Sequence, residues 1–188
     1  MKLHVCCGDV YLHGYTNIDI VGTIVEGEIQ GTDLENYYVK PLDLDSVRYK
    51  KKEQPIDMRV DILKPWPFYN NSVKKVVMIQ AIEHFTDKEA DYILGEIYRI
   101  LEPWGKLLID FPDIVGTVEQ WHLGSISWLN MVRMIYGTWA DGYAIHKYAY
   151  NSSSFYKLLN SNGRSWRSVE FKEVVPHDYP TLGAEAIK

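Results

Sequence analysis

Residues 73–111 constrain the fold most, because they predict a strand, a helix and a second strand in immediate succession. Val73–Ile79 and Lys106–Phe111 are apolar runs of strand length. Between them, Asp87–Leu101 carries apolar residues at helical spacing, and Pro103 follows just beyond its end. Strands joined by such a long crossover pair in parallel, with the helix packed on the sheet. The sequence therefore predicts an α/β fold built on a parallel sheet.

Elements of the same kinds are expected on both sides of this unit. The last two predicted strands are joined by a short segment, so we expect them to form an antiparallel edge. Residues 33–54 are polar and unpatterned, and they predict a loop or an insertion. The expected architecture is a single domain over residues 1–188, with three layers and helices on both faces of a mostly parallel sheet. The additional predicted strands are Leu3–Cys7, Tyr15–Ile20, Ile56–Ile62, Val169–Val174 and Leu182–Ile187, and the additional helices are Ile126–Tyr136 and Ser152–Leu159.

Composition and charge exclude several classes of protein. The formal net charge of −5 and a sequence pI near 5.7, without a basic stripe, argue against a nucleic-acid partner. No apolar run is long enough to cross a membrane, and the first residues leave no room for a signal peptide. We therefore expect no membrane partner and a cytoplasmic location. Cys6 and Cys7 are adjacent, which disfavours a disulfide bond between them.

Side chains suited to ligand binding lie at the ends of the predicted strands. Gly8 and Asp9 follow the first strand, Asp19 lies at the end of the second, and Asp61 at the end of the third. In an open parallel sheet, ligands bind beyond the carboxyl ends of the strands, where the strand order reverses. A glycine there lets the backbone approach a ligand, and an acid after the second strand can bind both hydroxyls of a ribose. Together these residues predict a nucleoside site.

Five ordered segments carry a family resemblance that extends over nearly the whole chain. In this order they resemble the class I, or Rossmann-like, S-adenosylmethionine-dependent methyltransferases, and within them a group of small predicted methyltransferases often associated with glycan biosynthesis. The resemblance implies the three-layer Rossmann-like methyltransferase fold, S-adenosylmethionine as cofactor, and a small-molecule or glycan-like acceptor. The segments are Leu3–Asp9, Gly14–Asp19, Val60–Ile62 with Pro67-Phe68 and Asn71–Val73, Ala81–Phe85, and Glu96–Ile109.

The resemblance also implies a role for each matching position in the cofactor site. Every one of these positions lies in or just after a predicted strand, so they can share one end of the sheet. The implied contacts are Cys7, Gly8 and Asp9 with the methionine part, Asp19 with the ribose hydroxyls, Asp61 and the Ile62 backbone with adenine, and Gln80 and Ala81 on the sulfonium side.

Acceptor-side candidates are expected after the fourth and fifth strands. The resemblance places His84 at the mouth of the site, and Asp113 follows the fifth strand. Residues 121–148 are rich in aromatic and histidine side chains and lie where an acceptor wall would belong. A neutral His146 could take a proton from an acceptor hydroxyl, since an unperturbed imidazole titrates near neutral pH. The sequence leaves a packing role for each histidine equally open.

The first turn departs from the family pattern. His4 stands where the family has an acid, Cys6 stands where it has a glycine, and a later glycine is missing, so only Gly8 remains. A Cβ atom at position 6 would press on the cofactor. The alternative function is therefore a vestigial methyltransferase fold that serves as a binding or scaffold protein without catalysis. Pro103-Trp104-Gly105 replaces a Pro-Gly-Gly turn, which is a tolerable change at a surface.

Other cofactors and partners find less support. A nicotinamide oxidoreductase would need a Gly-x-Gly-x-x-Gly motif, which the chain lacks. His4, Cys6, Cys7 and His13 are metal-ligating residue types, but the two cysteines of one strand point to opposite faces, so no metal site is predicted. Without a helix before the first strand, the sheet is thinly covered near Met1, and a homodimer would cover that face.

Overall fold

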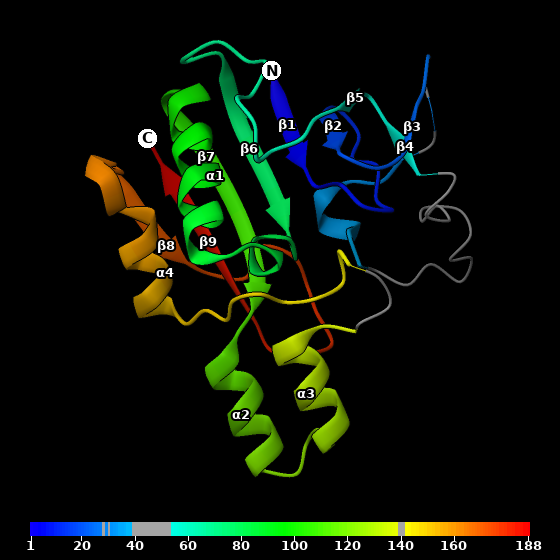
Figure 1. Cartoon of the computed structure of the whole chain (residues 1–188), viewed down its shortest axis with the longest axis vertical. Helices are drawn as coiled ribbons and strands as arrows, with labels where there is room; N and C mark the ends of the chain where they lie inside the picture. Colours follow the sequence, from blue (N-terminus) through cyan, green and yellow to red (C-terminus); the bar gives the residue numbers. More distant parts are fainter. Residues whose placement is uncertain (28, 30, 39–53, 139–141) are drawn as a thin grey trace.

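The computed structural model describes residues 1–27, 29, 31–38, 54–138 and 142–188. Within these residues, seven strands form one sheet in the order β5-β2-β1-β6-β7-β9-β8, and β3 pairs with β4 in a separate sheet (Figure 1). The strands are β1 (Lys2–Val5), β2 (Thr16–Asp19), β3 (Thr23–Ile24), β4 (Pro55–Ile56), β5 (Met58–Arg59), β6 (Val73–Ile79), β7 (Leu101–Pro112), β8 (Ser168–Phe171) and β9 (Thr181–Ile187). The helices are α1 (Asp87–Ile100), α2 (Ile114–His122), α3 (Trp128–Tyr136) and α4 (Ser152–Leu159), with short 3-10 turns η1 (Leu34–Asn36), η3 (Ile82–His84) and η4 (Ser161–Gly163).

The main sheet is mixed, and its strand order reverses beside β1. Strands β5, β2, β1, β6 and β7 run parallel, whereas β9 is antiparallel to β7 and β8 is antiparallel to β9. From β1 the chain moves outward to β2 and β5, and then returns to β6 on the other side of β1. The predicted α/β class and the antiparallel C-terminal pair are confirmed. A sheet of this kind binds ligands beyond the carboxyl ends of the strands at the reversal, here β1 and β6.

The predicted strand-helix-strand unit lies at the centre of the sheet. β6 has the predicted bounds, and α1 ends one residue before the predicted Leu101. Thr86 caps α1, because its hydroxyl accepts the Glu89 backbone N–H while the Glu89 carboxylate accepts the Thr86 backbone N–H. β7 begins earlier than predicted because Leu101 already pairs with Val73. Local sequence signals were therefore sufficient for this unit.

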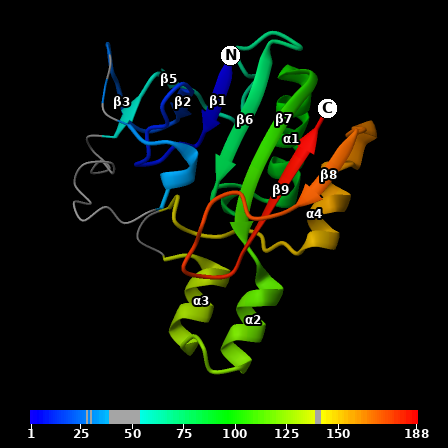
Figure 2. The same ribbon diagram turned by 180° about the vertical axis from the view of Figure 1, so that it is seen from behind.

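The two faces of the sheet are covered differently. α1 and α4 pack on one face, whose core includes Met78 and Leu107. The opposite face, which includes Val77 and Leu108, is covered by loop residues such as Leu12. No α-helix of the described residues packs on that face (Figure 2). The short crossover from β1 to β2 contains no helix, and part of the β2–β5 crossover lies outside the described residues.

The predicted strand Ile56–Ile62 is divided into β4 and β5, which pair in different sheets. Asp57 lies between the two strands. Its carboxylate accepts hydrogen bonds from the Asn17 backbone N–H at 2.6 Å and from the Tyr11 hydroxyl at 2.7 Å. These bonds hold Asp57 against β2 where the chain passes from β4, which pairs with β3, to β5, which pairs with β2. Residues 56–62 therefore do not form one straight strand.

The segment after β7 contains a helix, α2, that the sequence did not predict. Its first half has low helix propensity, because Ile114, Val115 and Thr117 are β-branched and Gly116 is flexible. Asp113 nevertheless caps the helix, its carboxylate accepting the Val115 backbone N–H at 3.1 Å. α3 begins two residues later than predicted, and the two helices form a hairpin beyond the end of the sheet (Figure 1).

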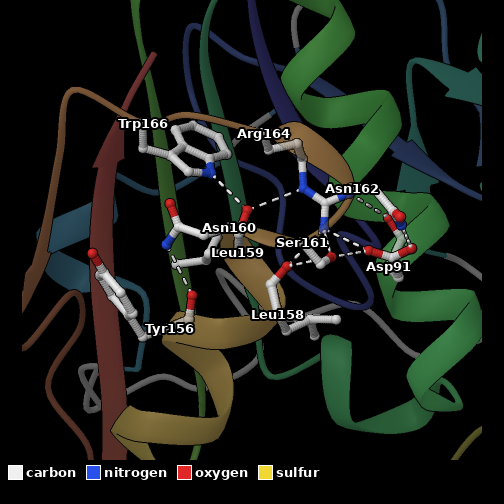
Figure 3. A network of polar contacts seen from close by, with 9 residues as sticks. All are labelled: Asp91, Tyr156, Leu158, Leu159, Asn160, Ser161, Asn162, Arg164 and Trp166. Carbon is white, nitrogen blue, oxygen red and sulfur yellow. Dashed lines mark hydrogen bonds and ion pairs between the residues drawn. The ribbon is translucent and has the colours of Figure 1, made fainter.

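A buried arginine joins the C-terminal helix to α1 (Figure 3). The guanidinium of Arg164 donates to the Asp91 carboxylate at 2.6 Å and to the Leu159 carbonyl at 3.0 Å. Ser161 and Asn162 donate to the same carboxylate. Because Arg164 is only 8% exposed, its charge depends on these partners rather than on water. We call this set the Arg164 network.

The predicted loop 33–54 and the expected absence of a membrane span can be compared only with the described residues. Most of the predicted loop 33–54 lies outside them, and within them Leu34–Asn36 forms the short turn η1. No helix in the described part of the chain is long and apolar enough to span a bilayer.

Candidate functional site

A cavity of about 690 Å³ lies at the carboxyl ends of β1, β2, β6 and β7. This volume is typical of a site for a small molecule. Its walls come from the strand ends and from two segments that follow α3. The lining includes Cys6, Gly8, Asp19, Val60, Asp61, Ile62, Gln80, Ala81, Glu83, His84, Arg133, Gly137, Thr138, Tyr143, His146 and Tyr179.

The cavity brings together most, but not all, of the predicted site residues. Cys7 is buried elsewhere, so Cys6 rather than Cys7 meets the cavity. Asp113 caps α2 instead of facing the cavity. In the described structure the predicted residues on its wall are Gly8, Asp19, Asp61, Ile62, Gln80, Ala81, His84 and His146, whereas Cys7, Asp9 and Asp113 are not on it.

The turn after β1 is held in place by Asp19. Its carboxylate accepts the Gly8 backbone N–H at 3.0 Å and the Val21 backbone N–H at 3.0 Å. Gly8 has a φ of 57°, which glycine adopts without strain. Asp19, at the end of β2, therefore fixes the turn that follows β1, and both Asp19 and Gly8 line the cavity.

Cys6 shares this turn and is strained, because its φ of 53° is unfavourable for a residue with a Cβ atom. Burial raises the pKa of its thiol well above the ordinary value, and the negative charge of Asp19 raises it further. The thiol is therefore protonated and neutral at pH 7, as is the thiol of Cys7, whose pKa is raised by burial first.

His4 occupies a buried polar network behind the turn. Its Nδ1 lies 2.9 Å from the side-chain oxygen of Asn17, and its Nε2 lies 3.0 Å from the hydroxyl of Tyr37. The amide oxygen can only accept, so Nδ1 carries the hydrogen and Nε2 accepts from the tyrosine. Burial lowers the His4 pKa to about 4, against a smaller opposing effect of Asn17. A neutral imidazole thus replaces the acid expected at this position.

Asp61 lies on the cavity wall after β5. Its carboxylate accepts the Leu63 backbone N–H at 3.1 Å and lies 3.1 Å from the ammonium of Lys64. The hydrogen bond with Lys64 is the largest cause that lowers the Asp61 pKa, and the Leu63 N–H adds to it. Asp61 is therefore an ionised hydrogen-bond acceptor at neutral pH.

Gln80 lines the cavity and is hydrogen-bonded to Asp110, a buried acid that was not among the predicted site residues. Its side-chain amide donates to Asp110 at 2.6 Å, and its backbone N–H donates to the Asp110 carbonyl at 2.8 Å. The same carboxylate oxygen lies 2.8 Å from Nε2 of His177. Gln80 has a φ of 48°, so these bonds hold it in a conformation that few residues other than glycine adopt.

Glu83, His84 and His146 meet at the far side of the cavity. The rings of the two histidines are edge to face, with centroids 4.9 Å apart. Burial lowers the pKa of His146 to about 4, and the charge of His84 lowers it further. Burial also raises the pKa of Glu83 to about 8. The site thus contains a carboxyl group and two imidazoles that are 62 residues apart in sequence.

The segment that carries His146 is fixed by backbone contacts with α3. Gly137 bridges to Ile145, the Thr138 N–H donates to the Ala144 carbonyl at 3.1 Å, and the His146 N–H donates to the Tyr136 carbonyl at 3.1 Å. A Cβ atom at Gly137 would lie 1.9 Å from the Ala144 carbonyl oxygen, so only glycine fits there. Sequence analysis predicted a wall over residues 121–148, and the part of that range that lines the cavity includes Gly137, Tyr143 and His146.

Comparison with protein families shows what this site belongs to. Residues 3–109 match the model of a family described as "Methyltransferase domain". The chain belongs to this family. Residues 3–109 therefore form a methyltransferase domain. The matched range of the methyltransferase domain includes Gly8, Asp19, Asp61 and His84, but it ends before α2, α3 and His146.

Solved structures show the same fold at low sequence identity. An S-adenosylmethionine-dependent methyltransferase from Mesorhizobium loti is 12% identical with a TM-score of 0.55, over 100% of this chain and 90% of its own. One from Methanosarcina mazei is 17% identical with a TM-score of 0.53, over 99% of this chain and 89% of its own. A protein from Pyrococcus horikoshii is 17% identical with a TM-score of 0.53, over 99% and 80%.

The chain spans little more than a third of the length of two other matched proteins. The chain spans 35% of human N-acetylserotonin methyltransferase and 37% of an O-methyltransferase-like protein from Nostoc punctiforme. Comparison with curated proteins gave no match. The family model and the solved structures establish the family and the fold, and they do not identify an acceptor.

Proposed function

We propose that this domain transfers the methyl group of S-adenosylmethionine to a hydroxyl or amine of a small-molecule or glycan-like acceptor. The observation that supports this function best is the single cavity shared by the ends of four strands and by the segment around His146. Direct methyl transfer requires that the cofactor and the acceptor occupy adjoining parts of one cavity. When bound, S-adenosylmethionine supplies an electrophilic methyl group on a sulfonium.

The residues on the β1–β2 side suit the cofactor. Asp19 and Asp61 present carboxylates to the cavity, which match ribose hydroxyls and an adenine amino group as hydrogen-bond donors. The Gly8 turn lets the backbone approach the methionine part, and Ile62 and Ala81 supply apolar walls. We extend the proposal to the predicted contacts of Cys7, Asp9 and Gln80, with Cys7 and Asp9 acting through the shape of the turn.

The acceptor is proposed to lie between η3 and the segment 142–147. His84 and His146 line this part of the cavity, and the rings of Tyr143 and Tyr179 add flat apolar surfaces to it. Such surfaces suit the apolar face of a sugar ring, which supports a glycan-like acceptor. Asp113 is a positioning residue in this proposal, because it caps α2. Methyl transfer depends mainly on alignment in a site that excludes water.

Replacing Asp19 by asparagine should weaken the binding of S-adenosylmethionine and of S-adenosylhomocysteine about 100-fold. The charged acceptor of the proposed ribose contact is lost, and hydrogen bonds to charged groups contribute about 1.5–3 kcal/mol each. Titration calorimetry of both nucleosides measures the effect, and thermal unfolding shows that the variant is folded. Glu119→Ala, a change on the exposed side of α2, is the matched control and should bind like the native chain.

The same titration separates the enzyme from a vestigial scaffold. Micromolar binding by the native chain that Asp19→Asn weakens about 100-fold supports the enzyme and justifies a screen of hydroxylated acceptors. Absence of binding to either nucleoside would overturn the proposed function. That result would favour the binding or scaffold protein, whose supporting observations are Cys6 and His4 in the first turn.

Replacing Cys6 by glycine should tighten the binding of S-adenosylhomocysteine about fivefold, which corresponds to about 1 kcal/mol. The Cβ and sulfur atoms of Cys6 occupy the cavity wall beside Gly8, and glycine removes them while relaxing a φ of 53°. Calorimetry again provides the measurement. Glu119→Ala, on the exposed side of α2, is again the control, and its affinity should be unchanged. Weaker binding by Cys6→Gly would mean that the thiol contacts the cofactor.

A further inference from the structure

Three groups that can ligate a metal ion converge in the acceptor half of the cavity. One ligand atom each from Glu83, His84 and His146 lies within 4.8 Å of the other two. Nε2 of His84 is 3.9 Å from a carboxylate oxygen of Glu83. Two imidazoles and one carboxylate form a ligand set that divalent transition metals bind in catalytic sites.

Glu83 gives the independent reason to expect a cation. The residue is only 2% exposed, yet among the described residues neither of its side-chain oxygens has a hydrogen-bond partner. A buried carboxyl group without hydrogen bonds is costly, and a bound cation removes that cost. Its backbone carbonyl is engaged, because it accepts the N–H groups of Lys147 at 2.8 Å and Tyr148 at 3.2 Å. These bonds fix the position of Glu83 beside the segment that carries His146.

The two histidines are oriented as metal ligands are. Nδ1 of His84 lies 3.1 Å from the Ile145 carbonyl, and Nδ1 of His146 lies 2.9 Å from the Met134 carbonyl. A carbonyl oxygen only accepts, so each Nδ1 carries the hydrogen and each Nε2 of the neutral ring carries the lone pair. Metal-ligating histidines are characteristically held by such a hydrogen bond from the other ring nitrogen to a backbone carbonyl.

We propose that Glu83, His84 and His146 bind a divalent transition-metal ion, with zinc the best match to two imidazoles and one carboxylate. Binding would bring the three ligand atoms, now within 4.8 Å of one another, to about 2 Å from one centre. Sites with three protein ligands keep a further position for water or substrate, and here that position lies in the cavity. The sequence predicted no metal because it weighed only the residues around Cys6 and Cys7, whereas this set joins η3 to a segment beyond α3.

The test is a Zn²⁺ titration of the untagged full chain after treatment with a chelator, carried out without S-adenosylmethionine. We expect one equivalent of Zn²⁺ to bind and to raise the melting temperature. Glu83→Gln and His146→Gln should each weaken the affinity by at least about tenfold. His122→Gln, which changes an exposed histidine on α2, is the matched control and should bind like the native chain.

The same experiment distinguishes a loss of metal binding from a folding defect. Glu83→Gln is nearly isosteric and removes a buried ionisable group, so its melting temperature without metal should be at least that of the native chain. A folded Glu83→Gln variant whose melting temperature Zn²⁺ does not raise supports the site. If that variant fails to fold, His146→Gln decides. No saturable binding by the native chain, or equal affinity in the folded variants, would overturn the metal site and leave the proposed methyl transfer standing.

Discussion

Replacing Arg164 by alanine should lower the free energy of unfolding by about 3 kcal/mol, because it removes a buried guanidinium and its charged hydrogen bonds, although its partner Asp91 is only partly buried. The substitution leaves the Asp91 carboxylate and the carbonyls of Leu158 and Leu159 without their guanidinium donor. The C-terminal segment would then lose its polar attachment to α1. Urea unfolding followed by circular dichroism measures the change.

Arg167→Ala is the matched control for this prediction. Arg167 is exposed and stacks on Trp104 with its guanidinium carbon 4.0 Å from the ring centre, so its loss should cost no more than about 1 kcal/mol. Arg164→Lys should fall between the two, because a lysine keeps the charge but lacks the planar fork of donors. Equal stability of Arg164→Ala and Arg167→Ala would show that the Arg164 network does not stabilise the fold.

A loss of about 3 kcal/mol is expected from His4 as the pH falls from about 6.5 to about 4. The folded His4 has a pKa of about 4, lowered by burial, whereas the unfolded chain has the ordinary value near 6.5. In this window the unfolded state binds the proton and the folded state does not, so protons favour unfolding. Above pH 6.5 both states are neutral at His4, and its contribution no longer changes with pH.

The measurement is the free energy of unfolding at pH 7.5 and pH 4.5 for the native chain and for His4→Gln. Carboxyl groups also titrate in this range, but they are common to both proteins and cancel in the difference. Tyr37 is the titratable side chain whose hydroxyl contacts His4, and it is unchanged in both proteins. The native chain should lose about 3 kcal/mol more than His4→Gln, while the exposed His122→Gln should follow the native chain. An identical pH dependence in native chain and His4→Gln would refute the buried neutral imidazole.

The parts of the fold that the sequence predicted correctly carry their signals locally. α1 has a capping box at Thr86 and Glu89, and α4 has its cap at Asn151, so their bounds follow from neighbouring residues. The parts that it missed depend on distant partners. β4 and β5 separate because Asp57 bonds to Asn17 and Tyr11, and no pattern within residues 56–62 indicates this.

The candidate site divides in the same way. Gly8, Asp19 and Asp61 were predictable because each follows a strand, and parallel strands end at one edge of the sheet. The contact of Glu83 with His146 depends on how the α2–α3 hairpin returns to the sheet, and α2 itself contradicts its helix propensities. Sequence reasoning could therefore place the residues at the strand ends, but it could not bring Glu83 and His146 together.

The central position of β6, α1 and β7 has a consequence for how the chain folds. These elements are consecutive in sequence, so their contacts close short loops and cost little chain entropy. The outer strands are different, because β2 and β5 are joined across residues 20–57 and β9 pairs with β7 only after α2, α3 and α4. The chain should nucleate at residues 73–112 and add its two edges later, so the cavity, which needs both sides, is completed last.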